Sequence, residues 1–302
     1  MLYALVDYSN KKGFIKRYFA EEILGEVKIL APKSNKGDTL MNPKKVLKNI
    51  EKYNVQNVVL NNELVQNENF CEMLMEHKKY IVTGRRLGKA LLLKILNDIS
   101  IYTKYNIQKL KVVLLMDEYS IENLNLIECI SKEVKQLSIV SKNHTKFEKT
   151  ANKLFERYGY SIKLYGDEVK EFKRDNVIIN LDFNSETLKN MYFNKYGIII
   201  SLNDKITNLR KSFEGIIIND IDILGEGIPK KNFRKLAVCE AKLYRPLRKV
   251  EDNEKVFFRE KYKINGYIGR SGKITGEDFE KIGKNYTWQK KNKWLIYFSV
   301  TF

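Results

Sequence analysis

Apolar residues recur in two alternating patterns through most of the chain. Short runs dominated by Val, Ile and Leu, such as Lys111–Met116 and Gly197–Leu202, are separated by longer segments in which apolar residues return every three or four positions. The short runs are typical of strands that are covered on both faces, and the longer spacing predicts amphipathic helices. Strands that alternate with helices predict an α/β fold with mostly parallel sheets.

The alternation falls into two blocks. In the first block we predict a helix over Lys11–Leu24 and strands at Leu2–Tyr8, Glu26–Ala31, Asn57–Leu60 and Tyr80–Val82. In the second block we predict strands at Lys111–Met116, Leu137–Ser141, Ser161–Leu164, Asn176–Leu181, Gly197–Leu202 and Gly215–Asn219. A long helix with a broad apolar stripe, Leu87–Tyr105, lies between the blocks. We therefore expect two Rossmann-like α/β domains, residues 1–86 and 87–225, joined by a long helix.

The pattern changes after Gly225. Glycines, bases and aromatic residues become frequent, with a predicted helix at Phe233–Leu243 and a strictly alternating strand at Trp294–Phe302. Residues 221–302 contain 19 Lys and Arg but only 10 Asp and Glu. We expect residues 226–302 to form a basic, aromatic-rich C-terminal extension.

The net charge of +18 has two explanations. Of the 55 basic residues 44 are Lys, which a solvated Lys-rich surface explains, whereas nucleic-acid sites favour Arg for bidentate contacts. The mixture of aromatics, glycines and bases from Phe257 to Trp288 fits base stacking and phosphate contact instead. A strand pair with a turn at Asn265–Gly266 explains the same residues structurally, so both explanations stay open.

Composition also bears on compartment and metals. No apolar run reaches the roughly 20 residues needed to span a bilayer, and the N-terminus is typical of a buried strand, so we expect a cytoplasmic protein without membrane partners. The three cysteines are far apart and are expected to be free thiols. Neither His77 nor His144 has neighbours at metal-ligand spacing, so no metal site is predicted.

The turn after the first strand of the second block contains no glycine. A dinucleotide-binding fold normally has glycines there, because the backbone must approach a pyrophosphate closely. The chain has none between Gly88 and Gly159, and the turn reads Asp117-Glu118-Tyr119-Ser120. Two carboxylates beside the helix N-terminus repel a pyrophosphate, so we expect the standard phosphate contact to be lost.

Two segments carry a resemblance to a known family. Ile139–Thr145 and Asn176–Asp182, within an N-terminal block, bridging helix and Rossmann-like block, resemble the amino-acid dehydrogenase-like architecture of shikimate dehydrogenases and glutamyl-tRNA reductases. The resemblance implies NADP as the cofactor, with Lys142, Asn143 and Thr145 at the motif that contacts its adenosine-side phosphate. The Lys–Asp pair of the shikimate dehydrogenases has no counterpart in the N-terminal block. The nucleophilic Cys of the glutamyl-tRNA reductases has none either, because the only cysteine of that block, Cys71, is expected to lie in the middle of a helix.

A second candidate anion site is the turn Thr83–Lys89. It follows a strand and opens a helix, so Arg85, Arg86 and Lys89 are expected to converge with the helix N-terminus. The turn departs from a phosphate-binding loop, since three residues instead of four separate Gly84 from Gly88 and Ala90 stands where Ser or Thr would bind Mg²⁺. A solvated interdomain turn explains the same residues.

Asp117, Glu118 and Asp182 also allow a different interpretation. An acidic pair at a strand end is similar to the site of a response-regulator receiver domain, with Asp182 as its phosphorylated carboxylate. The spacing from Asp117 to Asp182 is longer than that family uses. An acidic turn that caps the next helix is the alternative.

Three functional hypotheses follow, and the sequence leaves open whether the protein catalyses a reaction. The leading one is a degenerate dehydrogenase-like protein that has no cofactor and binds a small molecule or a protein partner. The first alternative is an NADP-dependent oxidoreductase with an atypical turn. The second is a nucleic-acid-binding protein that uses the basic C-terminal segment.

Overall fold

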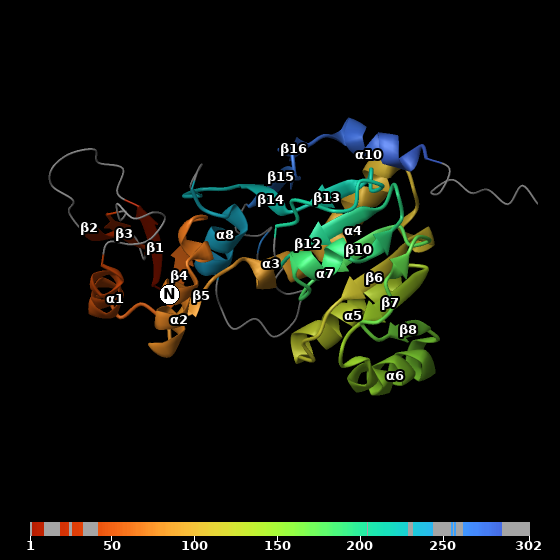
Figure 1. Cartoon of the computed structure of the whole chain (residues 1–302), viewed down its shortest axis with the longest axis horizontal. Helices are drawn as coiled ribbons and strands as arrows, with labels where there is room; N and C mark the ends of the chain where they lie inside the picture. The colour runs from red at the N-terminus through yellow and green to blue at the C-terminus, as the bar shows by residue number, and fades with distance from the viewer. Residues whose placement is uncertain are drawn as a thin grey trace, which may run out of the picture. The chain divides into compact units, whose positions relative to one another are not determined.

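The computed structural model divides into two compact units. It describes residues 2–8, 19–23, 26–32, 42–203, 205–228, 232–243, 255, 257 and 262–285 (Figure 1). Unit 1 comprises Met1–Ala90 and Asp222–Asn265, and unit 2 comprises Leu91–Ile221 and Gly266–Phe302. The chain therefore passes between the units three times. The predicted boundaries near residues 86 and 225 fall close to two of these crossings, and the predicted extension 226–302 is shared between the units.

Unit 1 is built on a five-stranded sheet in the order β2-β3-β1-β4-β5. Its strands are parallel except β2, which runs antiparallel to β3 at the edge. The strands are β1 Tyr3–Tyr8, β2 Phe19–Ile23, β3 Glu26–Ala31, β4 Asn57–Leu60 and β5 Tyr80–Ile81. The helices are α1 Pro43–Lys52, α2 Glu68–Glu76, α3 Arg85–Ala90 and α8 Lys235–Leu243, with the 3₁₀ helix η1 at Leu64–Gln66.

Side-chain alternation along β1 produces two apolar layers in unit 1. Ala4 and Val6 belong to a buried cluster that includes residues of α1 and α2. Tyr3 and Leu5 belong to a second cluster, which includes Val238 of α8. Successive residues of a strand point to opposite faces, so the helix predicted at Phe233–Leu243 is present as α8 and covers the second face of this sheet.

Unit 2 is built on a six-stranded sheet in which all strands are parallel. The strands are β6 Lys111–Leu115, β7 Gln136–Val140, β8 Ile162–Tyr165, β10 Val177–Asn180, β12 Ile198–Ser201 and β13 Ile216–Ile218. The order across the sheet is β13-β12-β10-β6-β7-β8. Read from β8 in chain order, this is the 3-2-1-4-5-6 arrangement of the Rossmann fold. The α/β class and the mostly parallel sheets predicted from the sequence are confirmed.

The remaining elements of unit 2 surround this sheet. Its helices are α4 Leu92–Thr103, α5 Ile121–Glu133, α6 Glu148–Tyr158, α7 Ser185–Lys189 and α10 Gly276–Gly283, with η2 at Ile107–Lys109 and η3 at His144–Phe147. The short strands β9 Glu171–Phe172 and β11 Tyr192–Phe193 form a separate parallel pair. The strands β14 Asp220–Leu224, β15 Lys263–Ile268 and β16 Lys273–Ile274 form a fourth sheet, and the division into units falls within both β14 and β15.

The C-terminal part of unit 2 packs against α4. Phe279 of α10 stacks on Tyr102, with ring centroids 5.5 Å apart. The buried hydroxyl of Tyr267 donates to Asp98 Oδ2 at 2.6 Å. Burial and the hydrogen bond to Asp98 raise the pKa of the Tyr267 phenol above its usual value. Residues 266–285 are therefore part of the core of this unit.

Two predicted helices differ from the structure. The helix predicted over Lys11–Leu24 is wrong at its end, because Phe19–Ile23 is the strand β2. Its apolar spacing also fits an edge strand, and pairing with β3 decides between the two. The helix predicted over Leu87–Tyr105 is present as α3 and α4, separated at Leu91. The strand predicted at Trp294–Phe302 lies outside the described residues.

Candidate functional site

The switch point of the unit 2 sheet lies between β6 and β10. The chain leaves β6 toward β7 on one side and leaves β10 toward β12 on the other. Loops that diverge in this way open a crevice at the carboxyl ends of the strands, where ligands of Rossmann folds bind. The turn Asp117–Ser120 follows β6, and Asp182 follows β10, so both lie at this point.

A carboxylate of the chain occupies the backbone donors of the turn. The N–H groups of Asp117 and Glu118 both donate to Asp182 Oδ2, at 2.7 and 2.9 Å. Consecutive N–H groups at this turn are the donors that a bound pyrophosphate would use. Asp182 therefore supplies the negative charge and the acceptor from within the protein.

The neighbouring turn after β7 is closed in the same way. Asp117 Oδ1 accepts the backbone N–H of Lys142 at 2.8 Å and the hydroxyl of Ser141 at 3.2 Å. Ser141 Oγ in turn accepts the N–H of Asn143 at 3.0 Å. The two acidic groups thus satisfy successive loops along the carboxyl edge of the sheet.

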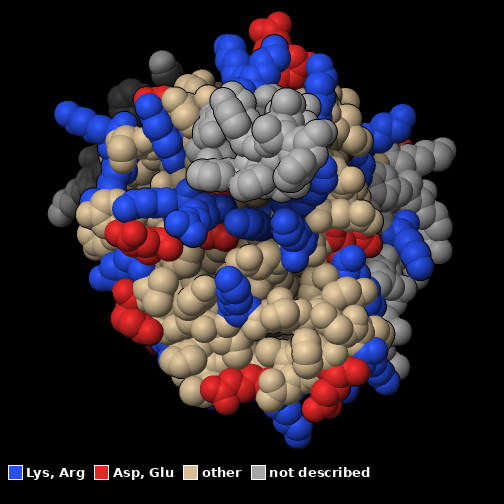
Figure 2. Space-filling view, turned by 90° about the vertical axis from the view of Figure 1, so that its right-hand side faces the viewer, with Lys and Arg blue, Asp and Glu red and all other residues tan. Residues whose placement is uncertain are grey.

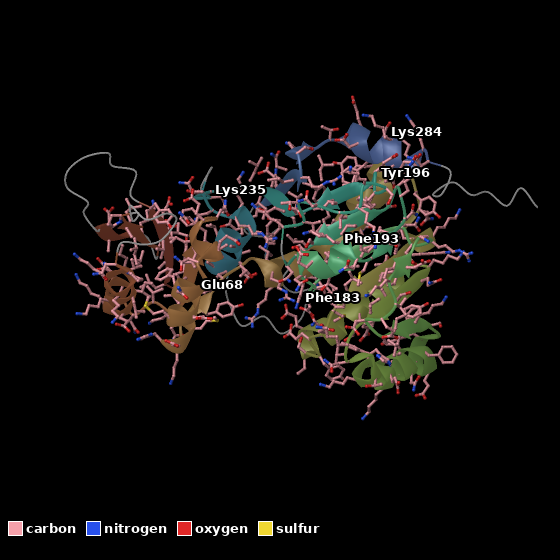
Figure 3. The ribbon with its side chains drawn as sticks, in the orientation of Figure 1. Glu68, Phe183, Phe193, Tyr196, Lys235 and Lys284 are labelled. Atoms are coloured by element: carbon pink, nitrogen blue, oxygen red, sulfur yellow. The ribbon has the colours of Figure 1, made fainter. Side chains whose placement is uncertain are left out.

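Two asparagines position the Asp182 loop. The fully buried Asn180 donates to the carbonyl of Phe183 at 2.9 Å and accepts its N–H at 2.9 Å. Asn203 donates to the carbonyl of Asp182 at 3.2 Å. Phe183 is labelled in Figure 3 at the end of β10. Buried amide networks of this kind fix a loop in one conformation, so the Asp182 carboxylate is held against the turn.

The N-terminus of α5 has its own cap. Ser120 is the N-cap, and its Oγ accepts the N–H of Asn123 at 3.3 Å. The buried Asn123 side chain donates to the carbonyl of Glu118 at 2.8 Å. The turn and the first turn of the helix are thereby satisfied by the protein itself.

The predicted cofactor residues follow β7 directly. The side chains of Lys142, Asn143 and Thr145 are exposed at the carboxyl edge. Thr145 and Glu148 have the spacing from which the sequence predicts a capping box for α6, and this prediction is wrong, because Thr145 lies within η3 and the N-cap of α6 is Phe147. A residue inside a 3₁₀ turn has helical backbone angles and cannot act as an extended N-cap. The cofactor role of these three residues stays a prediction.

The second predicted anion site also contains an internal carboxylate. Leu87 N donates to Oε2 of the buried Glu240 at 2.9 Å. Gly84 precedes this helix at φ +82°, and a Cβ there would lie 2.7 Å from Ala237 N, so α8 approaches the turn closely. Arg86 lies over the ring of Tyr80 at 5.4 Å.

The three basic residues of this turn do not share one environment. Lys89 is buried, whereas Arg86 is exposed and Arg85 lies between these extremes. Their role in anion binding stays a prediction. Sequence reasoning missed Glu240 and named Asp182 only as a candidate phosphorylated carboxylate, because the partners of both carboxylates are far away along the chain.

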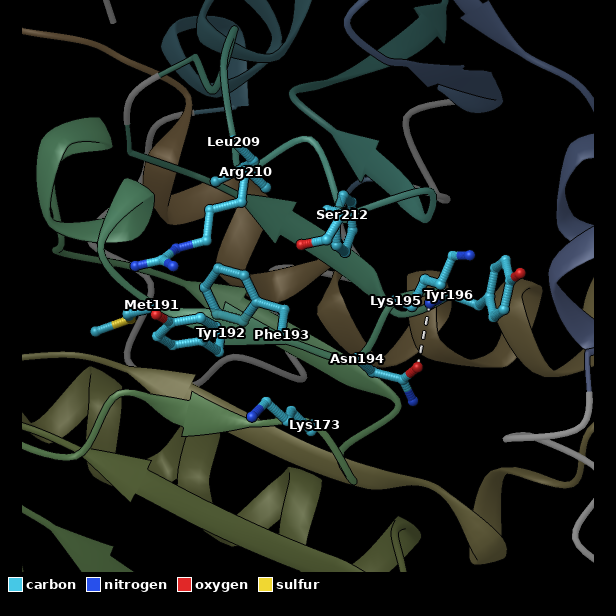
Figure 4. A pocket seen from close by; sticks show the side chains of 11 residues that line it. Lys173, Met191, Tyr192, Phe193, Asn194, Lys195, Tyr196, Leu209, Arg210 and Ser212 are labelled. Atoms are coloured by element: carbon cyan, nitrogen blue, oxygen red, sulfur yellow. Dashed lines mark hydrogen bonds between the residues drawn. The ribbon is translucent and has the colours of Figure 1, made fainter.

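A pocket of about 380 Å³ lies elsewhere in unit 2 (Figure 4). Basic and aromatic side chains line most of it, including Lys173, Tyr192, Tyr196 and Arg210. Its residues mostly precede strands β10, β12 and β13, so it is not the crevice at the switch point. No sequence motif predicts this pocket, because its lining comes from three separated segments.

Within the ranges given above, no helix is both long and apolar enough to cross a bilayer. In the same part of the chain, no group of three or more His, Cys, Asp or Glu could hold a metal ion.

The chain has matches among solved structures but not among family models or curated proteins. No protein-family model matches the chain, and no curated protein does. Among solved structures the chain is similar to the L-tryptophan dehydrogenase from Nostoc punctiforme, at 13% identity and a TM-score of 0.29 over 87% of this chain and 67% of that one.

Two further solved structures are similar over nearly their whole length. The quinate dehydrogenase from Corynebacterium glutamicum in complex with NAD has 10% identity and a TM-score of 0.32, covering 86% of this chain and 99% of that one. The 5-ketofructose reductase of Gluconobacter sp. strain CHM43 has 9% identity and a TM-score of 0.32, covering 94% and 98%. These scores carry no argument about activity. The strand order of unit 2 itself defines a Rossmann-like α/β domain.

Proposed function

We propose that the protein is a non-catalytic Rossmann-like binding protein. The observation that carries this proposal is the pair of hydrogen bonds from the Asp117–Glu118 backbone to Asp182. A pyrophosphate at this turn must displace a carboxylate that two asparagines hold in place. It must also approach the carboxylates of Asp117 and Glu118, and like charges a few ångströms apart cost on the order of 1 kcal/mol per pair even in solvent.

The chemistry of hydride transfer also requires a cofactor beside the substrate. The edge instead presents carboxylates that satisfy its own loops, which supports a role in binding a small molecule or a protein partner. Fold alone does not assign an activity, so the site carries this proposal.

Calorimetric titration with NAD, NADH, NADP and NADPH tests the proposal. We expect no binding tighter than about 1 mM, and micromolar binding of any of the four would overturn it. The variant Asp182→Ala should gain affinity for these dinucleotides, because it frees the two N–H donors. Asp167→Ala removes a carboxylate from the same edge without freeing those donors, so it should gain much less.

The alternative is an NADP-dependent oxidoreductase. The exposed Lys142 side chain supports it, since it lies at the strand end where the resemblance places the adenosine-side phosphate. If this alternative holds, replacing Lys142 and Asn143 by Ala weakens NADPH binding much more than NADH binding. Equal weakening of both would remove its basis.

The remaining hypothesis concerns nucleic acid and residues 226–302. Deleting this segment removes α8 and α10, which contribute to the cores of the two units. Point substitutions of the exposed Lys and Arg side chains in this segment are therefore the appropriate test. Nucleic-acid binding that survives these substitutions would contradict the hypothesis.

A further inference from the structure

The two edges of the unit 2 sheet carry opposite charge. Because all six strands are parallel, the segments that lead into them share one edge, here called the amino edge. These segments, 104–110, 134–135, 159–161, 173–176, 194–197 and 209–215, contain eight Lys or Arg and two Asp or Glu. The segments that leave the strands, 116–120, 141–147, 166–168, 181–184, 202–203, 205–208 and 219–220, contain three Lys and six Asp or Glu.

Figures 2 and 3 show the side of the molecule on which the amino edge lies. In Figure 3 Tyr196, which precedes β12, lies to the right of Phe183, which follows β10. Figure 2 views the molecule from that side, and Lys and Arg gather in a band across the middle of the face, with Asp and Glu mostly beside and below it. The edge that binds ligands in most Rossmann folds is therefore the acidic one, and the opposite edge has the positive potential.

The pocket described above lies at this amino edge and combines cations with aromatic rings. The Arg210 guanidinium lies 3.6 Å from the centroid of the Tyr192 ring, and Lys173 Nζ lies 5.2 Å from it. In Figure 4 the side chains of Arg210 and Lys173 lie on either side of Tyr192 and Phe193. Lys195 Nζ lies 5.1 Å from the ring of Tyr196.

Arg210 is held in position by the protein. Its Nε donates to the carbonyl of Lys189 at 3.2 Å, and its Nη2 donates to that of Asn190 at 3.5 Å. A guanidinium has five N–H donors, so these bonds orient the group and use two of them. Tyr192 is 39% exposed, which leaves part of its ring accessible to a ligand.

The acidic partners of the two lysines compete weakly with a phosphate. Lys173 pairs with Glu171 at 3.2 Å, and Lys195 pairs with Glu214 at 3.0 Å. Each of these four side chains is more than half exposed. Ion pairs between exposed side chains contribute little free energy, so a phosphate can replace the carboxylate as the partner of each lysine.

We propose that the amino edge of unit 2 binds single-stranded nucleic acid, with a base in the aromatic pocket and phosphates along the flanking Lys and Arg. Exposed rings beside a row of cations suit unpaired bases, since the bases of a duplex are stacked on each other. A volume of about 380 Å³ falls in the range of small-molecule sites and accommodates a base. The proposal does not rest on the absence of dinucleotide binding at the opposite edge.

Fluorescence anisotropy with labelled dT20 and rU20 tests the full-length protein. We expect binding at micromolar concentration that weakens steeply with salt. Arg210→Gln with Lys173→Gln should weaken it at least about tenfold and make the log–log salt slope shallower by about 1.4, the value for two phosphate contacts. Tyr192→Ala should weaken it at least about fivefold and change the slope less than the charge substitutions do, because it removes the ring and keeps the charges of Arg210 and Lys173.

A matched control is available at the carboxyl edge. Lys146→Gln with Lys149→Gln removes the same charge at the start of α6, where both side chains are exposed. Binding by this control should stay within about twofold of that of the unsubstituted protein, and an equal loss would overturn the proposal. Tyr196→Ala replaces Tyr192→Ala if the latter lowers the melting temperature.

Competition distinguishes the chemistry of the ligand. Unlabelled single strands should displace the probe at lower concentration than duplex DNA, inorganic polyphosphate or vesicles of anionic phospholipid. If polyphosphate or vesicles compete as well as single strands and Tyr192→Ala has no effect, the surface recognises charge alone and the proposal is wrong. Tighter binding of dT20 than of rU20 would identify DNA as the preferred single strand, and the reverse would identify RNA.

Discussion

Asp182 shows how one side chain decides what a Rossmann turn can bind. Its carboxylate accepts two backbone N–H groups from residues more than sixty positions earlier. In unit 1, Glu240 accepts the N–H of Leu87 in a similar way. Charge-assisted hydrogen bonds of this type are stronger than neutral ones. At both places the protein's own acid satisfies donors that suit an external anion.

The first residue-scale prediction concerns Asp182→Ala. Removing the acceptor leaves two N–H groups without a charged partner, so we expect the free energy of unfolding to fall by about 1–3 kcal/mol. Asp182→Asn retains an acceptor oxygen and should lose less. Urea denaturation measures both.

The freed donors provide a second readout of the same variant. Inorganic phosphate should raise the melting temperature of Asp182→Ala more than that of the unsubstituted protein, since a ligand that binds the folded state stabilises it. An identical response of the two proteins would contradict the assignment of this turn as an anion position.

The second residue-scale prediction concerns Cys239. Burial raises the pKa of its thiol to about 12, so almost no thiolate is present at pH 8. Ellman's reagent should therefore leave Cys239 unmodified in the folded protein and should modify it in denaturant. Rapid modification of Cys239 under native conditions would show that the packing of α8 against the unit 1 sheet does not bury this thiol.

At the scale of elements, capping and close approach define α10. Thr275 and Asp278 form a reciprocal capping box at its start. At its end, a Cβ on Gly283 would lie 2.1 Å from the carbonyl oxygen of Thr103 in α4. A local capping motif therefore defines where the helix begins, and a contact with a distant residue of the chain defines how its end packs.

The capping box predicts a pH dependence. The Thr275 backbone N–H holds the pKa of Asp278 below its usual value. A carboxyl with a lowered folded-state pKa contributes stability above its unfolded pKa, and this contribution is lost as pH falls through the folded value. Asp278→Asn should therefore destabilise the protein at pH 7 but not at about pH 2, as thermal unfolding at the two pH values would show. An equal loss at both would assign the effect to packing.

Two glycines of α10 make a matched pair. Gly283→Ala should destabilise unit 2 by about 1–3 kcal/mol, because the added methyl overlaps backbone of α4. Gly276→Ala in the same helix meets only Tyr102 side-chain atoms at 3.7 Å and beyond, so its effect should stay within about 0.5 kcal/mol. Chemical denaturation of the two variants measures the difference, and equal effects of the two substitutions would contradict the close approach of Gly283 to α4, since helix propensity by itself favours Ala over Gly.

At the scale of the whole molecule, distant parts of the chain complete each unit. The second face of the unit 1 sheet is covered by α8, which follows all six strands of the unit 2 sheet in sequence. Contacts of such large sequence separation form late and slowly. Unit 1 therefore depends on a segment that the sequence pattern assigns to an extension.

Truncation after residue 221 tests this dependence. We expect the fragment to expose the apolar face around Leu5 and Val59, to bind the dye ANS and to lose amide protection in β1 and β4. Full protection of those strands in the fragment would show that unit 1 folds without α8.

Much of the fold could be predicted from sequence, and most of the site could not. The six strands of unit 2 are runs of apolar residues, so local composition identifies them. The loss of the glycine turn is also visible in the letters Asp117-Glu118-Tyr119. Phe19–Ile23 was predicted as the end of a helix, because apolar spacing in a short segment fits either structure and the pairing partner decides.

The sequence by itself determined the α/β class, the strand and helix rhythm and the acidic turn, because these depend on side chains a few residues apart. Only the tertiary structure decided that Asp182 fills the turn and that α8 completes unit 1. It also placed the bases of six separate segments on one edge of a parallel sheet. Those contacts join residues far apart in the chain, and their free energy depends on distance and burial in the folded state, which local patterns do not encode.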